Sequence, residues 1–297
     1  MRASPKPRLL LTGASGFLGH NIIQQAQQHY QVIGIVQKHT VNLPGVQLVK
    51  MDITDHIALR NIVREVQPDA IIHAAAIGDV NRCEQYPRET EELNVGTSVY
   101  LAKLAAEMQL RYAFTSTDLV FDGEKGGYNE TDAPNPINHY GEQKVMAEEG
   151  IRAVYPQAAI CRMPLMFGVG GLGSKNFFLP LLTKIRASEE IGLFTDEYRS
   201  ALGAISAAKG LLLAVSAFNG TYHLGGPEKT NRYTLGILMA QAAGIGQPNI
   251  KAILQADVPM PAPRPKDVTL DSSKALAAGF EPMQNQAEIE FILRSGI

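Results

Sequence analysis

A tyrosine and a lysine stand four residues apart in the segment HYGEQKVMAEEG, whose pattern predicts a helix. Positions i and i+4 of a helix share one face, so Tyr140 and Lys144 would lie side by side. Because a nearby ammonium favours the ionised phenol, we expect it to lower the pKa of Tyr140. Such a tyrosine can donate a proton to a carbonyl under reduction, helped by a hydroxyl of Thr115-Ser116-Thr117. The pair alone is weak evidence, and its context decides.

A glycine-rich turn, TGASGFLG, joins the first expected strand to the first expected helix. Glycine permits a tight turn and lets the backbone approach a pyrophosphate, and the helix N-terminus offers free N–H groups to the phosphate charge. The spacing G-x-x-G-x-x-G differs from the G-x-G-x-x-G of many dehydrogenases, and a merely structural turn is the alternative. We expect a dinucleotide site formed by Gly13, Ser15, Gly16, Phe17, Leu18 and Gly19.

The end of the second strand discriminates between the two nicotinamide cofactors. A carboxylate there binds the ribose hydroxyls of NAD, whereas a cation suits the 2′-phosphate of NADP. The chain reads GIVQKHT, without an acid and with Lys38 and His39, so NADP(H) is favoured over NAD(H). A solvated loop position is the alternative for Lys38.

Two further segments are candidate cofactor contacts. Asp52-Ile53 is expected to end the third strand, where a carboxylate can receive the adenine amino group. A loop acid or helix cap is the alternative for Asp52. The fourth strand is followed by small residues that let a cofactor lie against backbone, or that serve close packing alone: Ala74, Ala75 and Ala76.

Short apolar runs alternate with helical patterns along the first half of the chain. Strands are expected at Leu9–Thr12, Val32–Val36, Gln47–Lys50, Ala70–His73, Tyr112–Ser116 and Ala158–Arg162. Helices are expected at Phe17–Gln28, Ile57–Val66, Glu89–Gln109, His139–Val154, Phe177–Arg186 and Ile205–Phe218. This alternation predicts an α/β fold with a doubly wound parallel sheet of the Rossmann type. Residues 1–168 would form the NAD(P)-binding domain, and residues 169–297 mainly a smaller, interleaved substrate-binding region with some segments returning to the first domain.

Composition limits the classes of protein. Of 297 residues, 45% are hydrophobic and 19% charged, and a net charge of −2 gives no basic field, so we expect no nucleic-acid partner. The longest apolar stretch, Leu211–Phe218, is far below the ~20 residues that span a bilayer, so we expect no membrane partner. Cys83 and Cys161 lack metal-ligand spacing and suit reduced thiols, and no metal site is expected. MRASPKPR contains no signal core, so a cytoplasmic protein is expected.

Together these residues resemble the extended short-chain dehydrogenase/reductase superfamily, and within it the dTDP-4-dehydrorhamnose reductase family. TGASGFLG is shared by the superfamily, and the segments PDAIIHAAAIGDVNRCEQYP, TSTDLVFDG, YNETDAPNPINHYGEQKVMAE and RPKDVTLDSSK are more specific to the reductase group. The resemblance covers essentially the whole chain. It implies an NAD(P)-dependent oxidoreductase whose substrate is a nucleotide-sugar of dTDP-rhamnose biosynthesis.

The resemblance also implies roles for single residues. Thr117 would be the catalytic hydroxyl, Tyr140 the proton donor, and Lys144 the supporting lysine that also binds the nicotinamide ribose. Asp118 would orient the substrate or the phenol. Leu119 stands where the family has a tyrosine that shapes the sugar pocket.

Three further residues are candidate substrate ligands. Asn176 and Arg264 occupy positions that face the nucleotide-sugar in the family, and a planar guanidinium suits a pyrophosphate. A surface salt bridge is the alternative for Arg264. Arg199, in a segment that lacks the D-L-A of the family, is a phosphate or sugar ligand or else an exposed loop arginine.

The leading hypothesis is an NADPH-dependent reductase of a nucleotide-linked 4-keto-6-deoxy sugar. The first alternative is an epimerase or dehydratase of the same superfamily, which would keep NAD bound. The second is a non-catalytic binding subunit like the regulatory subunit of methionine adenosyltransferase, and the third is a reductase of another carbonyl. The sequence is compatible with a homodimer.

Overall fold

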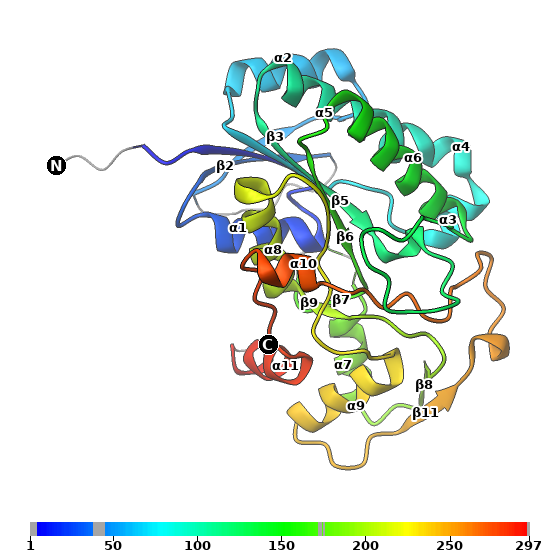
Figure 1. The fold of residues 1–297 in the computed structure, drawn as a ribbon. Helices are drawn as coiled ribbons and strands as arrows, with labels where there is room; N and C mark the ends of the chain where they lie inside the picture. Colours follow the sequence, from blue (N-terminus) through cyan, green and yellow to red (C-terminus); the bar gives the residue numbers. More distant parts are fainter. Residues whose placement is uncertain (1–4, 38–44, 172–173, 175, 296–297) are drawn as a thin grey trace.

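The computed structural model describes residues 5–37, 45–171, 174 and 176–295, and it is built around one seven-stranded sheet (Figure 1). The sheet is parallel throughout, in the order β10-β6-β5-β4-β1-β2-β3. Its strands are β1 Arg8–Thr12, β2 Gln31–Val36, β3 Gln47–Lys50, β4 Ala70–His73, β5 Arg111–Thr117, β6 Ala159–Met163 and β10 Gly220–His223. The doubly wound parallel sheet is therefore confirmed, and six of its strands lie within one residue of their predicted ends.

Helices cover both faces of the sheet, which explains why its central strands are mainly apolar. In β1, Leu9 and Leu11 face one core cluster and Leu10 faces the other, and all three are fully buried. The first face is covered by α1 Phe17–Ala26 and α8 Ala204–Ala217. The second is covered by α2 His56–Val66, α5 Thr97–Glu107 and α6 His139–Val154.

The helix expected at Glu89–Gln109 is interrupted. After α3 Val80–Gln85, the chain forms α4 Pro87–Glu91, one π-helical turn η1 Glu92–Gly96, and then α5. The wider turn directs the Asn94 side chain inward, where its amide binds the backbone of Ile77 and the side chain of Gln143. Residue periodicity alone did not reveal this insertion, because one extra residue barely changes the apolar pattern.

The second half of the chain forms a smaller unit and also returns to the sheet. Strand β10 extends the sheet beyond β6. Helix α8 packs against α1 (Figure 1). A separate apolar cluster joins α7 Phe178–Arg186, α9 Arg232–Ala242 and α11 Asn285–Arg294. The remaining elements are the pairs β7 Met166–Phe167 with β9 Leu202–Gly203 and β8 Ile191–Phe194 with β11 Ile250–Ile253, the short turns η2 Asp118–Val120 and η3 Gln255–Asp257, and α10 Ser273–Ala277.

Helix α8 receives its N-terminal cap from a residue more than 80 positions away. Its N-cap residue is Gly203, which has no side chain to accept a hydrogen bond. The buried carboxylate of Glu288, in α11, accepts hydrogen bonds from the backbone N–H of Ile205 at 2.8 Å and of Ser206 at 3.2 Å. A Cβ at Gly203 would lie 1.9 Å from Glu288 Cδ, so glycine is required there. This contact joins the C-terminal helix to the sheet domain.

Among the described residues, no helix has both the length and the apolar character needed to cross a bilayer.

Candidate active site

A groove of about 280 Å³ opens at the carboxyl ends of the first strands. It is lined by Gly13, Ser15, Gly16, Ile35, Val36, Gln37, Met51, Ile53, Ala74, Ala75, Ala76 and Leu93. The crevice at the carboxyl ends of a doubly wound sheet is where dinucleotides bind in such folds. Seven of the predicted cofactor residues therefore meet around one concave surface.

The turn after β1 has the features that a pyrophosphate requires. Gly13 has a φ of 71°, and a Cβ there would lie 2.9 Å from the backbone nitrogen of Ala75. Helix α1 begins after Gly16 without a side-chain cap and without an acid in its first turn. Its first N–H groups and the positive end of its dipole are thus available to an anion. The residues present fit a dinucleotide cofactor.

Several predicted cofactor residues lie beside the groove without lining it. Gly19 lies under the turn, where a Cβ would meet the Gly13 carbonyl oxygen at 2.1 Å, and Phe17 and Leu18 open α1. Strand β3 ends at Lys50 as predicted, so the placing of Asp52 and Ile53 at its end is wrong: the exposed Asp52 follows the strand and accepts hydrogen bonds from Thr54 and Gln37. Lys38 lies outside the residues that the structure describes.

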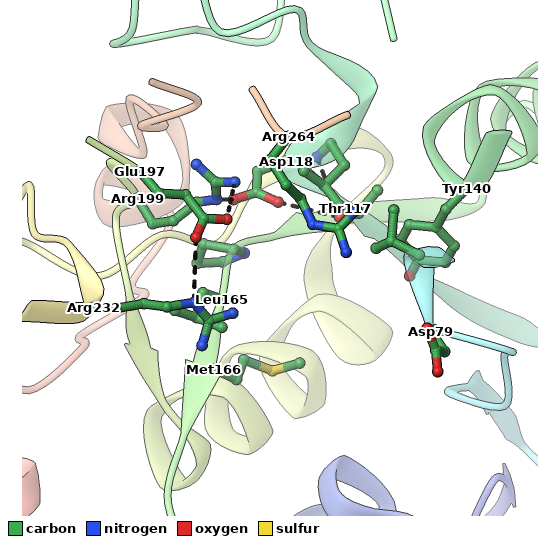
Figure 2. Close-up of a pocket in the computed structure, with 14 residues that line it drawn as sticks. Asp79, Thr117, Asp118, Tyr140, Leu165, Met166, Glu197, Arg199, Arg232 and Arg264 are labelled. Carbon is green, nitrogen blue, oxygen red and sulfur yellow. Dashed lines mark hydrogen bonds and ion pairs between the residues drawn. The ribbon is translucent and has the colours of Figure 1, made fainter. Parts of the chain in front are cut away.

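A second pocket, of about 390 Å³, lies beyond the loop that follows β4 (Figure 2). It is lined by Gly78, Asp79, Val80, Thr117, Asp118, Leu119, Tyr140, Pro164, Leu165, Met166, Glu197, Arg199, Arg232 and Arg264. The loop after β4 lines the cofactor groove with residues 74–76 and this pocket with residues 78 and 79. A ligand of the groove and a ligand of the pocket would therefore approach each other along this loop.

Thr117 is the one hydroxyl of the Thr115-Ser116-Thr117 run that lines the pocket. Strand alternation turns Ser116 to the opposite side, where its hydroxyl binds the buried Glu148 at 2.5 Å. The Thr115 hydroxyl donates to the backbone carbonyl of His73. Thr117, at the end of β5, donates to Asp118 Oδ1 at 3.2 Å and remains within reach of a pocket ligand.

Tyr140 enters the pocket from the first turn of α6. Asn138 caps this helix by accepting a hydrogen bond from the backbone N–H of Gly141 at 2.9 Å. A Cβ on Gly141 would lie 2.2 Å from the carbonyl oxygen of Leu119, so the glycine allows α6 to pack against the turn that follows Thr117. Local backbone packing thus brings Thr117 and Tyr140 to one pocket.

Lys144 is buried beneath Tyr140, as the i+4 spacing predicts, but it acts on the phenol differently from our expectation. The Lys144 ammonium donates a hydrogen bond to the Thr115 carbonyl at 2.8 Å, 5.8 Å from the Tyr140 ring centroid. Burial raises the pKa of Tyr140 above its ordinary value, and Cys83 and Asp118 act in the same direction. The prediction that Lys144 lowers the pKa of Tyr140 is therefore wrong for the protein without a bound cofactor, because the loss of solvation on burial dominates. The phenol stays protonated and can donate.

The Lys144 ammonium itself is also destabilised by its surroundings. Burial lowers the pKa of Lys144 to about 8, although Glu148 and Cys83 act in the opposite direction. The amine lies 4.5 Å from the centroid of the Phe114 ring, which gives it a cation–π partner.

A chain of charges crosses the pocket. Asp118 Oδ2 lies 3.4 Å from Arg199 Nε, and Arg199 donates to Glu197 at 2.9 Å. Glu197 also pairs with Arg232, the first residue of α9, at 3.3 Å (Figure 2). Arg199 is 4% exposed, so it is a buried pocket residue and not an exposed loop arginine. Burial raises the pKa of Asp118 to about 6, against the lowering effects of Arg199 and Thr117.

Arg264 reaches the pocket from the loop between η3 and α10. Its guanidinium donates to Asn81 at 2.8 Å and to the carbonyl of Ala262 at 3.3 Å, and it has no carboxylate partner among the described residues. Asn176, by contrast, is absent from the pocket lining. Its side-chain oxygen accepts hydrogen bonds from the first N–H groups of α7, of which that of Phe178 is at 3.0 Å.

Sequence reasoning missed several pocket residues. Glu197 and Arg232 gave no signal, since 35 residues separate them and only the fold joins them. Asp79 caps α3, in the segment PDAIIHAAAIGDVNRCEQYP that carried part of the family resemblance. No group of three His, Cys, Asp or Glu that could hold a metal occurs in the part of the chain that the structure describes.

The sheet, the glycine turn and the Thr-Tyr-Lys set define an extended short-chain dehydrogenase/reductase. Residues 7–295 match the RmlD substrate binding domain family, and the chain belongs to that family.

Known proteins support this assignment across nearly the full length. The probable low-salt glycan biosynthesis reductase of Haloferax volcanii is 30% identical over 270 residues, covering 89% of each chain. Methionine adenosyltransferase 2 subunit beta of Rattus norvegicus is 26% identical over 93% of this chain and 84% of its own. The crystal structure of dTDP-4-dehydrorhamnose reductase from Bacillus anthracis in complex with NADP superposes with a TM-score of 0.86 at 22% identity, covering 98% of this chain and 99% of that one.

Proposed function

We propose that this protein is an NADPH-dependent reductase of a nucleotide-linked 4-keto-6-deoxy sugar. The observation that carries the proposal is the joint position of Thr117 and Tyr140 on a pocket that also contains three arginines. One end of that pocket shares the loop after β4 with the dinucleotide groove. A proton donor, a hydroxyl and an anion-binding surface are thus assembled where a reduced cofactor would meet a sugar nucleotide.

Each residue has a defined task in this scheme. A bound nicotinamide would supply the hydride. Tyr140 donates its proton to the carbonyl oxygen as negative charge develops there, and its raised pKa keeps the phenol protonated until then. The Thr117 hydroxyl turns from Asp118 to the same oxygen, which stabilises charge that is larger in the transition state than in the substrate. Lys144, buried under Tyr140 and hydrogen-bonded to the Thr115 carbonyl, would bind the cofactor ribose and return a proton to Tyr140.

The proposed substrate matches the two kinds of side chain in the pocket wall, arginines and aliphatic residues. Arg264 and Arg232 offer donors to a diphosphate, and Arg264 does so without giving up a carboxylate partner. Leu119, Leu165 and Met166 form an aliphatic wall suited to the deoxygenated side of a sugar ring. Gln37, at the rim of the groove, has no charge to repel the 2′-phosphate of NADPH.

An NADPH-oxidation assay over a panel of nucleotide-linked 4-keto-6-deoxy sugars tests the proposal. We expect turnover with at least one member of the panel and a preference for NADPH over NADH. NADH oxidation of equal efficiency would refute the cofactor assignment, and inactivity on every member would refute the substrate class. Cofactor that remains bound as NAD after purification, together with epimerase activity, would favour the epimerase alternative.

The similarity to a methionine adenosyltransferase subunit favours one second candidate, a non-catalytic binding subunit. That function would need the dinucleotide groove but not the proton donor. Co-purification with a partner enzyme, and no turnover by protein that binds NADPH normally, would support it.

A further inference from the structure

The carboxylate of Glu197 binds two arginines that belong to different parts of the fold. Its Oε1 accepts a hydrogen bond from Arg199 Nη2 at 2.9 Å, and its Oε2 accepts one from Arg232 Nε at 3.3 Å. Glu197 is 6% exposed, whereas the Arg232 side chain is 31% exposed and lies over the Phe177 ring. Two arginines from different elements thus meet at one buried carboxylate.

Arg199 is shared between two carboxylates. Its Nε lies 3.4 Å from Asp118 Oδ2, beyond hydrogen-bond geometry, while its Nη2 binds Glu197 closely (Figure 2). Arg199 Nη1 donates a hydrogen bond to the backbone carbonyl of Tyr198 at 2.7 Å. Asp118 Oδ2 is consequently buried without a hydrogen-bond donor, although it lines the pocket. A buried acceptor without a donor is available to a ligand.

We propose that Glu197 is a positioning residue. By binding the Arg199 guanidinium, it keeps Arg199 from pairing fully with Asp118, so that Asp118 can accept a hydrogen bond from a hydroxyl of the substrate. The identity of that hydroxyl rests on the proposed function. The charge coupling among Glu197, Arg199 and Asp118, however, exists in the protein without any ligand. If Glu197 lost its charge, Arg199 would be drawn entirely to Asp118. The acceptor would then be occupied before substrate arrives.

The charged groups around Asp118 fix the direction of the effect. Burial raises the pKa of Asp118 to about 6, Arg199 and the Thr117 hydroxyl lower it, and Glu197 raises it. Tyr140 faces Asp118 as a neutral phenol. Removing the Glu197 charge should therefore lower the Asp118 pKa, whereas removing the Arg232 charge should raise it. Below this pKa, Asp118 is protonated and a weaker acceptor, so KM should rise as pH falls.

Carbon-13 NMR titration of the aspartate carboxyls, with the Asp118 signal assigned from Asp118→Asn, tests the coupling in the full chain. We expect Glu197→Gln to lower the Asp118 midpoint by about half a unit or more, as is typical for the loss of a nearby like charge. Arg232→Gln should shift the midpoint in the opposite direction. Glu190→Gln, an exposed residue paired with Lys251, is the matched control and should leave the midpoint in place.

Shifts of the Asp118 midpoint in opposite directions would support the proposal, because structural damage would not make the two variants shift the midpoint in opposite directions. An unchanged midpoint in Glu197→Gln, or shifts in one direction for both variants, would overturn it. If Glu197→Gln does not fold, the Arg232→Gln shift alone decides. The pH at which KM begins to rise on the acid side should shift together with the Asp118 titration midpoint. A wild-type protein that turns over no keto-sugar would refute the proposed function, while the titration would still test Glu197.

Discussion

Ser116 and Thr117 are neighbours in β5, yet their hydroxyls bind carboxylates on opposite sides of the strand. The Ser116 hydroxyl lies 2.5 Å from Glu148 in a buried network with Arg162, and the Thr117 hydroxyl lies 3.2 Å from Asp118 at the pocket. The strand therefore directs one hydroxyl to the core and the other to the pocket. Adjacent positions of β5 thus have different surroundings.

The first prediction concerns these two hydroxyls. Thr117→Val keeps the shape of the side chain and should lower kcat by about 10² or more, the usual effect of losing one donor to a developing oxyanion. Ser116→Ala should leave kcat within about threefold but lower the free energy of unfolding by about 1–3 kcal/mol, because Glu148 loses a buried donor. Steady-state kinetics and urea unfolding measure the two effects. Equal losses of kcat in both variants would contradict the assignment.

The second prediction concerns the alkaline side of the pH profile. Burial lowers the pKa of Lys144 to about 8, so its ammonium loses its proton as pH rises through that value. We expect kcat/KM to fall above pH about 8, measured between pH 6 and 10 where the protein remains folded. The residual activity of Lys144→Met should show no such limb. Persistence of the limb in that variant would assign it to another group.

The third prediction concerns Arg264. Its guanidinium lines the pocket without a carboxylate partner among the described residues, so its full charge is available to a diphosphate. Arg264→Gln should weaken binding of a nucleoside diphosphate about tenfold or more, since one charge-assisted hydrogen bond contributes ~1.5–3 kcal/mol. Affinity for NADPH should not change. Calorimetry measures both, and Arg294→Gln, whose side chain is 81% exposed on α11, is the control.

The fourth prediction concerns the cap that α11 supplies to α8. Glu288→Ala leaves the N–H groups of Ile205 and Ser206 without their acceptor and should lower the free energy of unfolding by ~1–3 kcal/mol. Glu290→Ala, on the same helix and more exposed, should change it by less than about 0.5 kcal/mol. Similar losses for both variants would show that the cap contributes nothing specific.

The same residue gives a pH dependence of stability. Burial raises the pKa of Glu288 above its ordinary value of 4.5, although its hydrogen bonds to Ser206 and Ile205 oppose the shift. The folded state then binds this proton more tightly than the unfolded chain does. The Glu288 contribution to the free energy of unfolding is fully present below pH 4.5 and declines as pH rises through the folded-state pKa. Glu288→Gln should remove this decline in urea unfolding measured across that range.

Local patterns predicted most of the fold and several residues of the candidate site. The strands of the sheet were visible as short apolar runs, and Thr117, Tyr140 and Lys144 were identified from their segments and spacing. Long-range partners were not visible in the same way. The cap from Glu288 joins segments 83 residues apart, and no local pattern encodes such a contact.

The electrostatics of the site likewise depended on the fold. The i+4 spacing placed Lys144 under Tyr140 correctly, but it carried no information about the Thr115 carbonyl that binds the ammonium or about the burial of the phenol. Arg199 was visible as a candidate, yet its burial and its division between Asp118 and Glu197 required the tertiary arrangement. Charge networks among residues distant in sequence are decided by packing.

The role of Tyr140 as proton donor is tested most directly by the NADPH-oxidation rate of Tyr140→Phe on the sugar nucleotide that the wild-type protein reduces. The phenyl ring keeps the packing of the phenol and removes only the proton donor. We predict a turnover at least ~10²-fold below that of the wild type, with NADPH affinity unchanged. Undiminished turnover by Tyr140→Phe would contradict the assignment of Tyr140 as the proton donor.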